Sequence, residues 1–157
     1  MPSITLCEIT RDNFQECLRL QPAPGQEHFV ASTVYSLAEA RVEPTLTPLA
    51  VYDGARMVGF AMWGHDPDEN RYWILRLLID RADQGKGYGR AALTEVISRL
   101  SRLPDCTSIS ISYHPDNRVA ERLYESLGFR RTGERLGHEV VARLDLPAQP
   151  GAQPLPE

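Results

Sequence analysis

Leu77-Leu78-Ile79-Asp80-Arg81-Ala82-Asp83-Gln84-Gly85-Lys86-Gly87-Tyr88-Gly89-Arg90 joins an apolar strand to the first turn of an amphipathic helix. The first N–H groups of a helix lack intrahelical partners and carry a partial positive charge, so they bind phosphate well. Glycine at positions 85, 87 and 89 leaves the backbone open to a close anion. Lys86 and Arg90 add positive charge beside it. The stretch therefore predicts a pyrophosphate-binding loop.

Two common phosphate loops do not match this stretch. The Walker loop requires GxxxxGK[ST], which the chain lacks, and the dinucleotide fingerprint GxGxxG spaces its glycines differently. What remains is Gln84-x-x-Gly87-x-Gly89 after a strand. The alternative interpretation is a glycine-rich turn between strand and helix that binds nothing.

Composition indicates a single soluble domain. The chain has 157 residues, of which 42% are hydrophobic and 24% charged, with a net charge of −4. We predict one domain at 1–146 and a disordered, proline-rich tail at 147–157. No basic run indicates a nucleic-acid partner, and no apolar run reaches the roughly 20 residues of a membrane span. Cys7, Cys17 and Cys106 lack metal-type spacing, so reduced thiols in the cytoplasm are expected.

Hydrophobic periodicity predicts strands and helices in mixed order. A first helix follows Thr10 or Asp12 with Phe14, Cys17 and Leu18 inward, and a second spans 27–42 with Val30, Val34 and Leu37 inward. A third helix runs from the glycine loop to Pro104, and a fourth runs from Asn117 to Gly128 with Val119 among its inward residues. Strands are predicted at 3–8, 49–52, 57–63, 72–79, 108–113, 129–134 and 139–144. The strand at 72–79 should be buried on both faces, and the third helix makes it parallel to 108–113.

The order of these elements, together with a second motif, resembles the GNAT superfamily of N-acetyltransferases. Residues 117–129 carry Asn117, Ala120, Tyr124 and a final Gly128-Phe129, in the order of the superfamily's second signature. The resemblance implies an α/β (α+β) fold: a mixed central sheet with splayed parallel strands, flanked by helices. Residues 34–40 and 72–80 further resemble bacterial spermine/spermidine acetyltransferases of the BltD type.

The resemblance also implies acetyl-CoA as co-substrate and places it on the chain. The pyrophosphate would lie on Gln84, Gly85, Lys86, Gly87, Tyr88, Gly89 and Arg90. The pantetheine arm would pair with the backbone of Leu77, Leu78 and Ile79, and an N–H near Leu78 would polarise the thioester carbonyl. Asn117 would bind the pantetheine amide, although asparagine there is also a plain helix cap.

Tyr124 is the predicted general acid. It follows Asn117 by seven residues, so both side chains lie on one helix face, and a phenol can protonate a departing thiolate. The alternative is a tyrosine that only packs in the core. The sequence does not identify the general base. Related enzymes often carry a carboxylate on the central strand, where this chain has Leu75-Arg76, which leaves water or the carboxylates Glu27, Glu39, Asp66 and Asp80.

The acceptor site is predicted between the first two helices and the β-hairpin that follows them. Acidic and aromatic side chains attract a cationic amine, so a polyamine such as spermine or spermidine is expected as acceptor, and a homodimer is one expected assembly. No metal site is expected, because the four histidines are isolated. The alternatives are a protein α-amine, an aminoglycoside-type amine, or a non-catalytic acyl-CoA-binding module. The residues expected to line the acceptor site are Tyr35, Glu39, Trp63 and Tyr72.

Overall fold

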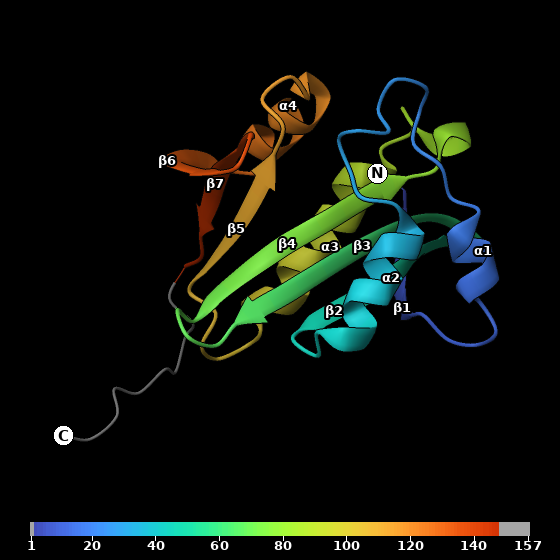
Figure 1. The fold of residues 1–157 in the computed structure, drawn as a ribbon, viewed down its shortest axis with the longest axis horizontal. Helices are drawn as coiled ribbons and strands as arrows, with labels where there is room; N and C mark the ends of the chain where they lie inside the picture. Colours follow the sequence, from blue (N-terminus) through green and yellow to red (C-terminus); the bar gives the residue numbers. More distant parts are fainter. Residues whose placement is uncertain (1, 148–157) are drawn as a thin grey trace.

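A seven-stranded mixed sheet forms the centre of residues 2–147, the part of the chain that the computed structural model describes (Figure 1). The strands lie in the order β1-β2-β3-β4-β5-β7-β6. The strands are β1 (Thr5–Glu8), β2 (Leu46–Asp53), β3 (Arg56–Asp66), β4 (Arg71–Ile79), β5 (Ser108–Tyr113), β6 (Arg130–Leu136) and β7 (Glu139–Asp145). The helices are α1 (Phe14–Leu18), α2 (Thr33–Val42), the short 3₁₀ turn η1 (Arg81–Asp83), α3 (Tyr88–Ser101) and α4 (Arg118–Ser126).

The predicted element order and mixed α/β architecture are confirmed. β4 and β5 are the parallel pair, joined by the crossover helix α3, and all other neighbouring strands are antiparallel. The predicted disordered tail at 147–157 lies outside the described residues, apart from Pro147.

Helices cover both faces of the sheet and create two apolar cores. On one face, Leu93, Val96 and Leu100 of α3 pack against the sheet in a large cluster that also includes Phe129. On the other face, Cys17 of α1 lies in a smaller cluster against which residues of α2 pack. In Figure 1, α2 lies in front of β2 and β3, whereas α3 lies behind the sheet.

The predicted extent of the second helix was wrong. Residues 27–30 form a turn and a bend, and α2 begins only at Thr33 because the Ser32 hydroxyl caps it, accepting the N–H of Tyr35 at 3.1 Å. This shorter helix buries Thr33 and Ser36 and leaves Val34 60% exposed. The apolar spacing that suggested Val34 as an inward residue had assumed helix continuous from Glu27.

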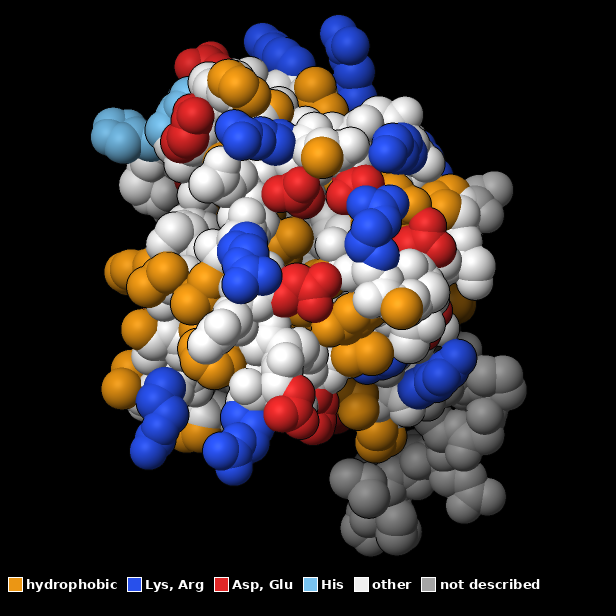
Figure 2. All heavy atoms as spheres, turned by 90° about the vertical axis from the view of Figure 1, so that its right-hand side faces the viewer, with side chains coloured by type: hydrophobic (Ala, Val, Ile, Leu, Met, Phe, Trp, Pro, Cys, Tyr) orange, Lys and Arg blue, Asp and Glu red, His pale blue; other side chains and the backbone are white. Residues whose placement is uncertain are grey.

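Three other predicted inward residues face solvent. Phe14 and Leu18 of α1 are each 39% exposed, because this helix has only five residues and buries Cys17 alone. Val119, in the first turn of α4, is 70% exposed. On the face near α1 and α2, shown in Figure 2, basic and acidic side chains are interspersed, and the described residues form no continuous basic patch on that face.

The two parallel strands part from each other halfway along their length. Only 72–74 of β4 pair with 109–111 of β5, and beyond Ile74 the strands diverge, as Figure 1 shows. A bulge lies at the same place: Trp63 pairs with Ile74 and Met62 with Arg76, so Leu75 is an extra residue in β4. Burial on both faces, predicted for all of 72–79, therefore holds only in part; Tyr72, Ile74 and Leu78 are buried and the others are half-buried.

Candidate active site

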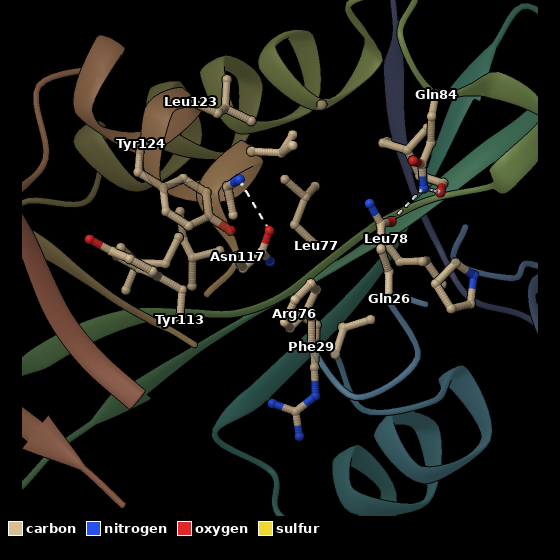
Figure 3. Close-up of a pocket in the computed structure, with 18 of the residues that line it drawn as sticks. Gln26, Phe29, Arg76, Leu77, Leu78, Gln84, Tyr113, Asn117, Leu123 and Tyr124 are labelled. Atoms are coloured by element: carbon tan, nitrogen blue, oxygen red, sulfur yellow. Dashed lines mark hydrogen bonds between the residues drawn. The ribbon is translucent and has the colours of Figure 1, made fainter. Parts of the chain in front are cut away.

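A cavity of about 650 Å³ opens where β4 and β5 diverge. Segments from several parts of the chain line it (Figure 3): the loop at 26–31, the second half of β4, the glycine loop, the end of β5, the inner side of α4, and Glu139 at the start of β7. The predicted phosphate loop, the strand edge, Asn117 and Tyr124 all contribute to this one space. Elements that are distant in the sequence thus meet at the gap in the sheet.

The glycine loop has the open backbone that the sequence predicts. Gly85 and Gly87 have φ values of +78° and +87°, which side-chain-bearing residues rarely adopt, and Gly87 caps α3. A side chain at Gly85 would point into open space, so its absence keeps the loop accessible. The amide of Gln84 fixes the start of the loop by donating to the carbonyl of Ile79 at 3.1 Å. The N–H groups of the first turn of α3 are therefore exposed to the cavity mouth.

Ionic contacts to one buried carboxylate hold this loop to the sheet. Asp83 is 3% exposed and its carboxylate lies 2.6 Å from Arg56 and 3.4 Å from Lys86. Burial alone would raise the pKa of Asp83, but the hydrogen bonds from Arg56 and Lys86 outweigh it and hold that pKa below its usual value. Tyr88 is buried and its hydroxyl donates to Asp53. Asp83 and Tyr88 are therefore anchors of the loop.

Arg90 lies at the outer end of the loop, on the first turn of α3. Its guanidinium donates to the Ser126 hydroxyl at 2.6 Å, so it links α3 to α4, and its side chain remains exposed. Lys86 is also exposed, with its ammonium beside Asp83. Both cations therefore lie within three residues of the start of α3, and each contacts a neighbouring side chain.

Along the edge of β4 that has separated from β5, the backbone groups of Leu77 and Ile79 face the gap. The N–H of Asp80 donates to the carbonyl of Val58 in β3 at 2.9 Å, and strand residues alternate in the neighbour they face. Leu78 therefore hydrogen-bonds toward β3, whereas Leu77 and Ile79 face the gap. The bond from Gln84 to the Ile79 carbonyl agrees with this direction. Within the predicted trio, the backbone N–H groups that face the gap are therefore those of Leu77 and Ile79, whereas that of Leu78 faces β3.

Asn117 is both a helix cap and a residue of the cavity wall. Its side-chain oxygen accepts the N–H of Ala120 at 3.3 Å and caps α4, and the residue also lines the cavity (Figure 3). Because the cap uses the oxygen, the amide NH₂ is the end of the side chain that can serve a ligand.

Tyr124 is buried, with 8% of the residue exposed, and its ring reaches the cavity from α4. Figure 3 shows its hydroxyl directed toward Asn117, and the ring of Tyr113 packs 5.4 Å away between centroids. Burial, and to a lesser degree the charges of Glu139 and Tyr113, raises the pKa of Tyr124 well above its ordinary value. The phenol is therefore protonated at neutral pH, which is the state a general acid requires.

None of the four predicted acceptor residues lines the cavity. Tyr35 is 59% exposed on α2, and Trp63 packs with the core on the α3 side. The Tyr72 hydroxyl donates to Asp105 at 2.8 Å, away from the gap, and burial followed by this hydrogen bond raises its pKa to about 12. Glu39 is held by Arg76 at 3.2 Å. Trp63, Tyr72 and Glu39 form structural contacts, Tyr35 faces solvent, and the cavity wall comes from other residues.

The four predicted base candidates also lie outside the cavity lining. Glu27 is exposed, Asp66 accepts the N–H of Asp68 at 3.0 Å, and Asp80 caps η1 and accepts the N–H of Gln21 at 2.9 Å. Among residues 2–147, no cluster of His, Cys, Asp and Glu could hold a metal ion.

Two parts of the cavity wall could not be foreseen from the sequence. Glu139, at the start of β7, lines the cavity, although the surrounding hairpin carries no motif that points to a site. The loop at 26–31 contributes Phe29, whose ring lies 4.0 Å from that of His28 and 5.7 Å from that of His114. This aromatic contact joins the loop before α2 to the loop after β5. The only indication in the sequence was the adjacent aromatic pair His28-Phe29, in a segment predicted as helix.

Comparison with known proteins is consistent with this geometry. A model of the acetyltransferase (GNAT) family matches residues 6–129. The spermine/spermidine N(1)-acetyltransferase of Bacillus subtilis is 34% identical over 138 residues, which cover 84% of this chain and 91% of that protein.

Solved structures of low identity share the fold. The ribosomal-protein-S18-alanine N-acetyltransferase from Escherichia coli superposes with a TM-score of 0.74 at 18% identity, covering 98% of this chain and 100% of that one. The spermidine N-acetyltransferase from Vibrio cholerae, in complex with CoA and spermine, gives 0.71 at 16%, covering 89% and 92%. Within the described part of this chain, no helix has the length and apolar character needed to cross a bilayer.

Proposed function

The chain belongs to the acetyltransferase (GNAT) family, and from this premise we propose that it transfers the acetyl group of acetyl-CoA to a primary amine of a polyamine. One observation carries the proposal: a single cavity brings together the glycine loop at the start of α3, the strand edge at Leu77 and Ile79, and the buried phenol of Tyr124. The similarity to a spermine/spermidine N(1)-acetyltransferase over most of both chains favours a polyamine as acceptor.

The residues present fit acetyl-CoA at each point along the cavity. The glycine loop and the start of α3 would bind the pyrophosphate, with Lys86 and Arg90 beside it. The backbone of Leu77 and Ile79 would bind the pantetheine arm as an added strand, and the amide of Asn117 would bind it from the other side. When bound, acetyl-CoA supplies the acetyl thioester.

Direct transfer then requires three contributions from this chain: charge stabilisation, proton donation and positioning of the amine. The N–H of Leu77 or Ile79 stabilises the negative charge that develops on the thioester oxygen during attack by the amine. Tyr124 donates its phenolic proton to the departing thiolate. The cavity positions the amine against the thioester and limits its access to water. Each task uses a group on the wall of the same cavity.

A panel assay tests the reaction and the acceptor together. Purified protein, acetyl-CoA and each of four acceptors would be followed by thiol release: spermidine, spermine, an aminoglycoside, and a peptide with a free N-terminus. We expect release with the polyamines at kcat/KM at least tenfold above the other two acceptors. Release with only the aminoglycoside or the peptide would refute the polyamine assignment. CoA binding by calorimetry without release for any amine would instead indicate a binding module.

A further inference from the structure

We propose that Glu139 receives the ammonium group of the acceptor and removes its proton before attack; this assignment rests on the proposed acetyl transfer. Glu139 was not among the carboxylates that the sequence suggested. It lies at the first position of β7 and contributes to the wall of the cavity that holds Tyr124.

The alternation of β7 places Glu139 on the face of the sheet opposite α3. Val140 and Ala142 belong to the large core on the α3 side, so Glu139 and Val141 face the other way. Ser112 of β5 faces the same way, since Ile111 and Tyr113 belong to that core, and its hydroxyl donates to Glu139 at 3.2 Å. Tyr124 of α4 belongs to the core on the α3 side and lines the same cavity. The carboxylate and the phenol therefore reach the cavity from opposite faces of the sheet.

The charge of Glu139 is free to act on a ligand. The cavity is also lined by Asp83, but Asp83 is neutralised by Arg56 and Lys86 at the phosphate loop. Among residues 2–147, Glu139 forms no ion pair, and its one hydrogen bond comes from the neutral Ser112 hydroxyl. Its negative charge also influences the titration of Tyr124, which indicates that the two groups are near each other. A half-buried carboxylate without a cation suits a cationic acceptor.

The proton balance of the reaction is complete with these two residues. The ammonium gives one proton to the Glu139 carboxylate, and the neutral amine forms the N–C bond to the thioester carbonyl carbon. As the C–S bond breaks, Tyr124 gives its proton to the thiolate. The phenolate then takes the second proton from the new N–C nitrogen, which leaves a neutral amide. Glu139 releases the first proton to solvent, so one proton leaves per turnover and both residues return to their starting states.

The test compares Glu139→Gln with the wild type over pH 6.5 to 9.5, measuring kcat and KM for the best acceptor of the panel. We expect kcat/KM to fall about 100-fold at pH 7.5, the usual scale of a lost general base. The deficit should shrink to tenfold or less at pH 9.5, where more of the amine is already neutral. Glu139→Asp, which keeps the carboxylate, should retain an intermediate rate.

Glu134→Gln is the matched control. Glu134 lies on β6 of the same hairpin, and its carboxylate binds Arg71 at 3.0 Å outside the cavity lining, so kcat and its pH profile should stay unchanged. CoA affinity by calorimetry should be equal in all variants. A Glu139→Gln enzyme with wild-type kcat at every pH, even if KM rises, would overturn the base assignment. A wild-type enzyme that binds CoA but acetylates no amine would overturn the proposed function itself.

Discussion

The guanidinium of Arg56 on β3 lies 2.6 Å from the carboxylate of Asp83, the residue that ends η1 and leads into the glycine loop. The same carboxylate holds Lys86 of the loop at 3.4 Å. The loop that would bind the pyrophosphate is therefore anchored to the sheet through one buried carboxylate, and its position depends on the charge state of that group.

Replacing Arg56 with Gln should lower stability at neutral pH and weaken CoA binding. The pKa of Asp83 is held below its unfolded value, so this contribution is present above the unfolded pKa, near 4, and is lost as pH falls through the lower folded pKa. The difference in urea midpoint between wild type and Arg56→Gln should therefore be largest at pH 7 and shrink toward pH 3. A difference that is constant with pH would contradict this origin.

Tyr124→Phe should lower kcat by about 100-fold or more, because the thiolate would leave without a proton donor. The ring that packs on Tyr113 remains, so the melting temperature and the CoA dissociation constant should stay close to wild type. Steady-state kinetics and calorimetry would measure both. Unchanged turnover would remove Tyr124 from the mechanism and leave it a packing residue.

Gly85→Ala should impair CoA binding, whereas the same substitution at the control position Gly133 should not. Gly85 and Gly133 have φ values of +78° and +89°, and a methyl group at either would meet no atom within 4 Å. Alanine at either position should cost about 1 kcal/mol of stability through backbone strain. Only Gly85→Ala should also raise the CoA dissociation constant, by tenfold or more. Equal CoA affinity in the two variants would argue against a phosphate at this loop.

Two substitutions at Asn117 separate its cap from its ligand contact. Asn117→Ala should cost about 1 kcal/mol of stability through loss of the cap on α4, whereas Asn117→Ser keeps a capping oxygen and most of that stability. Both variants lose the amide NH₂, so both should bind CoA several-fold more weakly. A serine variant with wild-type affinity would show that the cap is the whole role of Asn117.

The three thiols should differ in reactivity. Burial raises the pKa of both Cys17 and Cys106 to about 11, while Cys7 is half-buried on β1. A disulfide reagent at pH 8 should therefore modify one thiol in the folded protein and all three in urea. The contribution of the two buried thiols to stability is present below their unfolded pKa, near 8.5, and is lost as pH rises through about 11.

Much of this fold could be predicted because strong local signals agreed with one another. The glycine loop required positive φ at Gly85 and Gly87, and Asn117 carried both a cap and a superfamily motif. The start of α2 was missed because its cap at Ser32 competes with an apolar pattern that continues toward Glu27. Trp63 and Tyr72 were expected at the acceptor site but lie outside the cavity lining, because register decides which face a strand residue occupies. The bulge at Leu75 and the pairing of β5 with β7 depend on contacts between residues that are distant in the sequence, so no local pattern predicts them.

The gap between β4 and β5 has a consequence for the lifetime of the protein as well as for its chemistry. Only three residue pairs join the two halves of the sheet along this seam, so the ligand-free protein should open there first when it unfolds. A pantetheine arm lying in the seam would supply the missing backbone bonds, and saturation at 100 times the dissociation constant would add roughly 2.7 kcal/mol to the stability. Starved of its acyl donor, the protein would become easier to proteolyse, so its abundance would follow the metabolic supply of acetyl groups.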